Sequence, residues 1–111
     1  MTLIEGQDVS TIRIEVDGHM IATAEVHRTD RPGVVHSDLH ADSGPLPRGT
    51  RTRLVDAVLD HPEVHHARSL LATMPLGDTE MLDRVRQRCG DVRARAAGAT
   101  KLVEARLLHP A

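Results

Sequence analysis

Apolar and polar residues alternate in three successive stretches between Thr11 and His40. Such alternation is typical of a strand with one buried face. The dipeptide Asp17-Gly18, which strongly favours a hairpin turn, separates the first two stretches, and the turn sequence 30–33 (Asp-Arg-Pro-Gly) separates the last two. The pattern therefore predicts an antiparallel meander of three strands, whose inward-facing residues are Ile12, Ile14, Val16, Ala22, Ala24, Val26, Val35, Ser37 and Leu39.

A loop rich in glycine and proline, residues 43–49, follows the meander. Apolar residues then recur at helical spacing, which predicts a helix that starts near Thr50 and is stopped by Pro62. A short apolar strand is predicted around residues 69–74. Because a helix separates it from the third strand, the connection is a crossover, and we expect the two strands to pair in parallel.

A second helix is predicted to begin after Asp78, a residue suited to the N-cap position. Gly90 is predicted to end this helix. Residues 91–108 indicate one or two strands bent at Gly98. The apolar stripe of the second helix consists of Met81, Leu82, Val85 and Cys89.

The predicted fold class is therefore α+β: an antiparallel β meander followed by β-α-β-α-β, in a mixed sheet with two helices. Residues 1–111 are expected to form a single domain. Within it, residues 1–10 are expected to be a loose lead-in, and the core is expected to span residues 11–108.

The composition narrows the classes of partner. The 111 residues include no Phe, Tyr or Trp, and the formal net charge is -2. We therefore expect no nucleic-acid partner and no membrane association. Cys89 is the only cysteine, which fits a reducing compartment and favours a cytoplasmic protein. A core without aromatic side chains buries less area, so we expect either modest stability or support from a partner subunit. That partner would be a second copy of the chain, in a homodimer, or another protein.

The order of elements resembles the central and C-terminal part of the GNAT acetyltransferase superfamily. The matching loop and helix start is 48–55 (Arg-Gly-Thr-Arg-Thr-Arg-Leu-Val), where Gly49 stands at the family's first loop glycine and Arg51 replaces the second. In the closing segment 85–91, Gly90 fits the family pattern. In the same segment Arg86 stands at the usual Tyr and Asp91 at the usual Phe.

The resemblance implies a GNAT-like mixed sheet that binds acetyl-coenzyme A through its pyrophosphate. It implies a cofactor site at Arg48, Gly49, Thr50 and Arg51. The charge pattern points the same way, because cations at a helix start are disfavoured by the helix dipole unless an anion lies beside them. The alternative is that these arginines extend into water. The resemblance also implies that the family's N-terminal strand and first two helices have no room in this chain.

A second candidate site is the run His36-x-Asp38-x-His40-x-Asp42, whose four side chains would share one face of a strand with Glu25 and His27 of the neighbouring strand. One interpretation is a general base for an amine, at Glu25, His36 or His40. Another is a divalent metal such as zinc. The third is a solvent-exposed sheet face. Residues i and i+2 lie about 6.5–7 Å apart along a strand, which is wide for two ligands of one ion, so we assign no metal ligand.

Two functions remain open at this point. The first is a reduced acetyltransferase-like module that binds acyl-coenzyme A and transfers an acetyl group to an amine, as an acetyl-CoA-dependent N-acyltransferase. The second is a non-catalytic interaction or dimerisation domain that keeps the fold without the chemistry. Cys89 is predicted to be a small core residue in either case.

Overall fold

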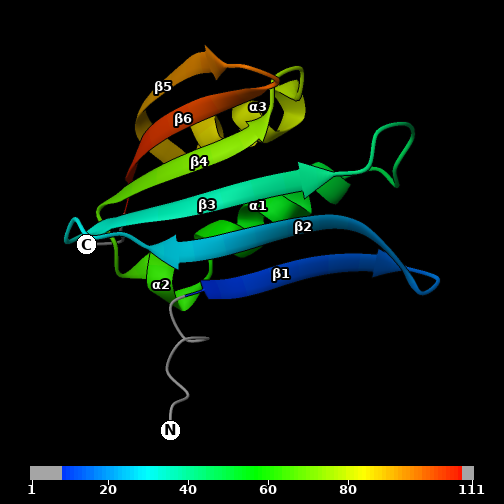
Figure 1. Ribbon diagram of the computed structural model, residues 1–111, viewed down its shortest axis with the longest axis horizontal. Coiled ribbons are helices and arrows are strands. Elements are labelled where there is room, and N and C mark those ends of the chain that lie inside the picture. The colour runs from blue at the N-terminus through cyan, green and yellow to red at the C-terminus, as the bar shows by residue number, and fades with distance from the viewer. Residues whose placement is uncertain (1–8, 109–111) are drawn as a thin grey trace, which may run out of the picture.

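The computed structural model describes residues 9–108, which form one six-stranded sheet with helices on one side (Figure 1). The strand order is β1-β2-β3-β4-β6-β5. The elements, in chain order, are β1 (Val9–Val16), β2 (His19–Arg28), β3 (Val34–Ala41), α1 (Thr50–Leu59), α2 (Pro62–His65), β4 (Ser69–Pro75), α3 (Thr79–Arg88), β5 (Cys89–Ala97) and β6 (Thr100–Leu107).

The pairing of the strands follows the predicted turns. β1, β2 and β3 form an antiparallel meander, β3 pairs with β4 in parallel, and β6 inserts antiparallel between β4 and β5. At the first hairpin Asp17 has φ 52° and Gly18 has φ 81°. Positive φ at both central positions is what a two-residue turn needs to match the twist of its strands. The turn therefore sets the pairing of Val16 with His19 and of Glu15 with Met20, and the register then shifts by one residue between Glu15 and Ile14.

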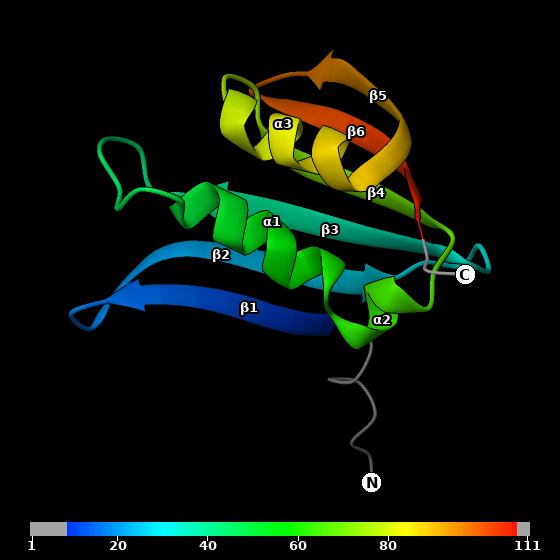
Figure 2. The ribbon, with the colours of Figure 1, turned by 180° about the vertical axis from the view of Figure 1, so that it is seen from behind.

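All three helices lie against the same face of the sheet (Figures 1 and 2). Between the helices and the sheet lies a core built from Leu, Val, Ala and Met, in which Leu54 of α1 and Met81 of α3 are fully buried. The inward-facing residues of β2, β3, β4 and β6 complete this core, as their period-two alternation requires. They are Ala22, Ala24, Val26, Val35, Ser37, Leu39, Leu70, Ala72, Met74, Val103, Ala105 and Leu107.

Within residues 9–108 no helix covers the opposite face of the sheet, which we call the bare face (Figure 1). Its side chains are mostly polar, and opposite charges face each other where Arg93 of β5 is paired with Glu104 of β6. A sheet with one packed face and one polar face is stable in water. No helix in the described part of the chain is long and apolar enough to cross a membrane.

A network of ion pairs joins the two long helices. Asp56 of α1 accepts from Arg84 and Arg88 of α3, at 2.7 Å and 3.1 Å. Arg88 also donates to Asp60, at 2.9 Å. The hydrogen bond from Arg84 is the main cause that lowers the pKa of the Asp56 carboxyl, with Arg88 adding to it against the effect of burial. The pairs fix the helices relative to each other, and hence also their N-terminal ends.

The predicted fold class is confirmed, and so are the predicted strand faces except at Val16. Val16 is predicted to face inward, but it is 39% exposed, because the register of β1 and β2 shifts between Ile14 and Glu15. β1 starts at Val9, so the predicted lead-in is shorter, and residues 1–8 lie outside the described residues. Pro62 ends α1 as predicted but also begins α2, a third helix of one turn, because proline suits the first helical position. The tail forms two strands.

Two further corrections concern the ends of α3 and β3. Gly90 does not cap α3: the helix ends at Arg88, Cys89 is already extended with φ -126°, and Gly90 pairs with β6. Because β5 follows the helix directly, no left-handed residue ends the helix; the left-handed residue of this segment is Asp91, with φ 49°, where the register with β6 shifts between Gly90 and Arg93. Asp42 lies beyond the end of β3, so it does not continue the strand face of His36 and His40.

Candidate functional site

β3 and β4 separate at their carboxyl ends and leave a cleft. Their parallel pairing runs from Val34 and Ser69 to Asp38 and Thr73, and β3 then continues to Ala41 while pairing only with β2. Figure 1 shows the two strands diverging towards their arrowheads. The cleft at this end has a volume of about 490 Å³, and its lining residues are Ala41, Asp42, Ser43, Gly44, Arg51, Pro75, Gly77, Asp78, Thr79 and Glu80.

The N-terminal end of α1 borders this cleft. Gly49 precedes the helix with φ 83°, a left-handed conformation, and a Cβ atom there would meet nothing within 4 Å. Thr50 is buried, and both its backbone N and its Oγ1 donate to the carbonyl oxygen of Pro47, at 3.2 Å and 2.7 Å. Within residues 9–108 the backbone N–H groups of Gly49 and Arg51 have no acceptor. They are donors at the positive end of a helix dipole.

A carboxylate of the same chain occupies part of this helix end. Oε2 of Glu80, in the first turn of α3, accepts from the backbone N of Thr52 at 3.1 Å and from Thr52 Oγ1 at 2.9 Å. The first turn of α1 contains no acidic residue of its own. Glu80 therefore supplies the negative charge that the N-terminal end of α1 favours.

Arg51 makes an ion pair across the cleft. Its Nε lies 2.8 Å from Oδ2 of Asp78, and its Nη2 donates to the carbonyl oxygen of Asp42 at 3.3 Å. The Asp78 side chain is only 5% exposed, and its Oδ1 caps α3 by accepting from the backbone N of Met81 at 3.0 Å. Buried carboxylates need such partners, so Arg51 stabilises the start of α3 in this structure.

A second cation contacts Asp78 at the start of α3. Lys101 of β6 is 6% exposed, and its Nζ donates to the carbonyl oxygen of Asp78 at 2.7 Å. The sequence identified Asp78 only as a residue suited to the N-cap of a helix. It did not reveal that Asp78 pairs with Arg51, or that Glu80 accepts hydrogen bonds from Thr52. Lys101 carried one available signal, since a lysine at an inward-facing position of an alternating strand calls for a buried acceptor.

The predicted phosphate residues thus have different environments. Arg48 is exposed and precedes the helix start, and Gly49 leaves the backbone open. Thr50 holds the loop through Pro47, and Arg51 lines the cleft but is bonded to Asp78. The structure brings the four together at one helix end, with two of the four side chains already engaged by the protein.

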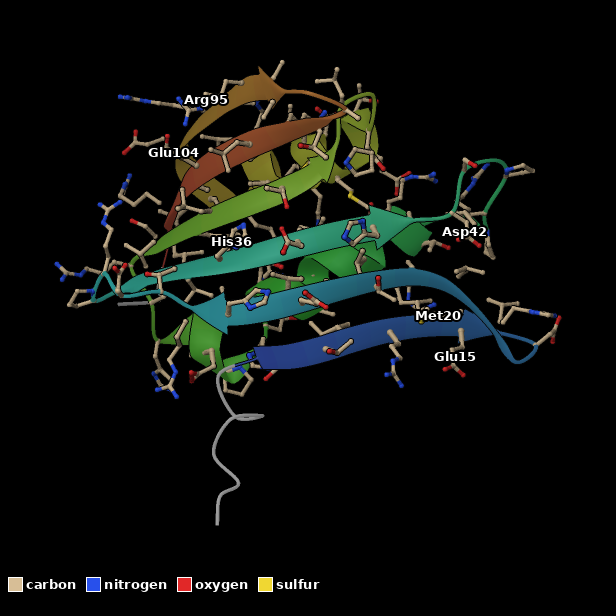
Figure 3. The ribbon with its side chains drawn as sticks, in the orientation of Figure 1. Glu15, Met20, His36, Asp42, Arg95 and Glu104 are labelled. Carbon is tan, nitrogen blue, oxygen red and sulfur yellow. The ribbon has the colours of Figure 1, made fainter. Side chains whose placement is uncertain are left out.

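The three predicted bases do not form one site. Glu25 and His36 lie in the closed part of the sheet on the bare face, where Figure 3 labels His36. His40 lies four residues after His36, roughly 13 Å along the strand, beyond the end of the pairing between β3 and β4. It lines a shallow pocket of about 230 Å³ next to the cleft, and the two share Ala41 and Asp42.

Cys89 is a core residue, as predicted. It is 7% exposed, and burial raises the pKa of its thiol, while the charge of Arg88 acts in the opposite direction. A thiol that stays protonated is a poor nucleophile. Cys89 therefore has no part in the candidate site.

Comparison with known proteins supports the fold alone. No protein-family model matches the sequence, and no curated protein matches it. Among solved structures, the GNAT domain of S. lividans PAT is 13% identical with a TM-score of 0.62, over 90% of this chain and 61% of that one. The ribosomal-protein-alanine N-acetyltransferase of Brucella melitensis is 13% identical with a TM-score of 0.62, over 94% of this chain and 72% of that one.

A third similar structure contains AcCoA. The GNAT superfamily phosphinothricin acetyltransferase of Sinorhizobium meliloti, in complex with AcCoA, is 11% identical with a TM-score of 0.61, over 94% of this chain and 64% of that one. The chain therefore spans only 61–72% of the length of these three structures. The resemblance read from the sequence is confirmed at the level of architecture: this chain has the fold of the GNAT N-acetyltransferases, in a divergent form.

Proposed function

We propose that the chain binds an acyl-coenzyme A in the cleft between the carboxyl ends of β3 and β4, and that it transfers the acyl group to an amine. The observation that supports this most is the open cleft beside an N-terminal helix end with two unpaired N–H groups, on a fold shared with acetyltransferases. Helix N-termini of this kind bind phosphate groups. The two unpaired N–H groups therefore support a pyrophosphate site at the start of α1.

The fit of the side chains is less complete. The N–H groups of Gly49 and Arg51 would hold the pyrophosphate, and the exposed guanidinium of Arg48 would add charge. Thr50 would keep the loop in place. Glu80 opposes binding, because its carboxylate lies at the neighbouring N–H of Thr52. In this proposal the exposed Glu80 side chain swings away when a phosphate arrives.

His40 is the best placed of the three predicted bases for an amine acceptor. It lies where β3 has separated from β4, and its pocket adjoins the cleft. When bound, acyl-coenzyme A supplies an acyl group activated as a thioester. The amine nitrogen would bond to the acyl carbon, the C–S bond would break and coenzyme A would leave as its thiolate, while the imidazole of His40 would accept the proton that the amine loses. Glu25 and His36 lie deeper in the closed sheet and would not reach the same substrate.

The direct test is to titrate acetyl-coenzyme A and to follow thermal unfolding by circular dichroism and binding by calorimetry, since the chain has no aromatic residue for fluorescence. At about 100 times its dissociation constant, a ligand that binds only the folded state adds about 2.7 kcal/mol of stability. We expect Arg48→Ala to weaken this effect. Arg95→Ala, which removes the same charge from β5 at the far edge of the sheet, is the matched control (Figure 3).

Arg51→Ala is a less clear test, because it also leaves the buried Asp78 carboxylate without its ion pair. The absence of any acetyl-coenzyme A binding, in a protein shown to be folded, would contradict the proposal.

The second candidate is the non-catalytic interaction domain. It is favoured by two contacts within the chain that occupy the proposed cofactor site, Glu80 with Thr52 and Asp78 with Arg51. In this second case the chain would form a homodimer or bind another protein. It predicts a concentration-dependent dimer in analytical ultracentrifugation and no response to coenzyme A, even after Glu80 is neutralised.

A further inference from the structure

Two histidines and two carboxylates form a four-residue cluster on the bare face of the sheet. β2 and β3 pair so that His27 lies opposite His36, and Glu25 lies opposite Asp38. All four side chains share one face, because each is two residues from its neighbour on the same strand. We call Glu25, His27, His36 and Asp38 the histidine cluster. It lies in the closed part of the sheet, apart from the cleft.

The donor atoms of the histidine cluster converge. His27 Nε2 lies 3.3 Å from Glu25 Oε1 and 3.7 Å from Asp38 Oδ2, and His36 Nε2 lies 3.4 Å from Asp38 Oδ1. One ligand atom from each of His27, His36 and Asp38 lies within 4.8 Å of the other two. In a tetrahedral site with bonds of about 2.1 Å, neighbouring donor atoms lie about 3.4 Å apart. The observed separations are therefore close to those of a zinc site.

We propose that the histidine cluster binds a divalent transition-metal ion, with His27, His36 and Asp38 as ligands and Glu25 beside them. Two imidazoles favour Zn²⁺ and its neighbours in the first transition row over Mg²⁺ or Ca²⁺, which prefer oxygen. His36 and Asp38 are i and i+2 on β3, and their side chains lean together so that Nε2 and Oδ1 lie 3.4 Å apart, closer than the spacing of about 6.5–7 Å along the strand suggests. His27 joins them from β2, because directly opposed residues are about 4.5–5.5 Å apart.

The electrostatics of the histidine cluster favour a cation. Glu25 and Asp38 are directly opposed, and like charges in that position destabilise a sheet. Within residues 9–108 no lysine or arginine makes an ion pair with either carboxylate; their ion-pair partners are the two histidines. A bound divalent ion would offset the repulsion between the two carboxylates.

The surroundings also hold the donor atoms in place. Thr73 of β4 donates its hydroxyl hydrogen to Oδ1 of Asp38, which orients that carboxylate as an outer hydrogen bond does in metal sites. The rings of His27 and His36 stack with their planes 26° apart and their centroids 5.8 Å apart. The three ligand side chains are 29–33% exposed, so an ion can enter from solvent and keep a water ligand.

The test is a calorimetric titration of Zn²⁺ into the metal-free protein, prepared without a polyhistidine tag. We expect one equivalent to bind. The variants His27→Ala and His36→Ala should each weaken binding by more than about tenfold, and the double variant should remove it. His40→Ala is the matched control, since His40 lies on the same strand face outside the histidine cluster, and it should bind Zn²⁺ as the unchanged protein does.

Co²⁺ provides a second readout, because a tetrahedral site with histidine ligands gives it a visible absorption spectrum that the double variant should lack. Circular dichroism of each variant establishes that it is folded. Failure of the unchanged protein to bind Zn²⁺, or equal binding by the double variant, would overturn the proposal. Neither result depends on coenzyme A, so the metal site and the proposed function are tested separately.

Discussion

Neutralising Glu80 should weaken the fold slightly and strengthen phosphate binding at the same time. Glu80 Oε2 accepts from Thr52 N at 3.1 Å and from Thr52 Oγ1 at 2.9 Å. Glu80→Gln keeps the shape and an acceptor oxygen but removes the charge. Loss of a negative charge at an exposed helix N-terminus costs about 0.3–1 kcal/mol. For a domain of this size we expect the melting temperature to fall by roughly 1–4 °C.

The gain in affinity follows from Coulomb repulsion. A phosphate bound to the neighbouring N–H groups would lie on the order of 5 Å from the Glu80 carboxylate, where two unit charges repel by about 0.8 kcal/mol in water. A doubly charged pyrophosphate therefore feels about 1.7 kcal/mol, which physiological salt reduces to about 1 kcal/mol. We expect Glu80→Gln to bind acetyl-coenzyme A roughly fivefold more tightly than the unchanged protein.

Calorimetric titration of acetyl-coenzyme A, with inorganic pyrophosphate as a second ligand, measures this change. Asp83→Asn is the control: Asp83 lies on the same helix and is exposed, and its side chain makes no hydrogen bond or ion pair within the described part of the chain. It should change the affinity by less than about twofold. Equal or weaker binding by a folded Glu80→Gln would refute the reasoning that Glu80 competes with phosphate at α1.

Three further predictions concern the fold. Leu54→Ala truncates a side chain of α1 that is 0% exposed, so it should lower the free energy of unfolding by about 3–5 kcal/mol in urea denaturation, and a loss under about 1 kcal/mol would contradict its place in the core. Ser37→Ala removes a buried Oγ that has no hydrogen-bond partner among residues 9–108; stability should stay unchanged or rise by about 1 kcal/mol, and a clear loss would reveal a missed partner. Asp56→Asn removes a carboxyl whose pKa is lowered below its ordinary value of 3.8, chiefly by the hydrogen bond from Arg84. The ionised carboxyl therefore contributes its full stabilisation above about pH 3.8, and this contribution is lost as the pH falls through the lower pKa of the folded protein. The unchanged protein should be more stable than Asp56→Asn at about pH 7, and a difference that persisted at about pH 2 would contradict this assignment.

The candidate site was predictable only in part. The loop at Arg48 and Gly49 could be recognised because a glycine before a helix with clustered arginines is a local pattern. The engagement of Arg51 by Asp78 could not, because the two residues are 27 positions apart and meet only when α1 and α3 are placed side by side. The same holds for Glu80 and Thr52, which are 28 positions apart.

Amino-acid sequence by itself determined the order of the two long helices and the first four strands in this protein, the buried faces of β2 and β3, and the first hairpin turn. These are local properties: alternation, helical spacing and the demands of Asp17-Gly18 act over a few residues. Only the tertiary structure decided that β6 lies between β4 and β5, and that His27 faces His36. The physical reason is register. Which residues meet across two strands depends on how whole elements pair and pack, and no short stretch of sequence encodes that alignment.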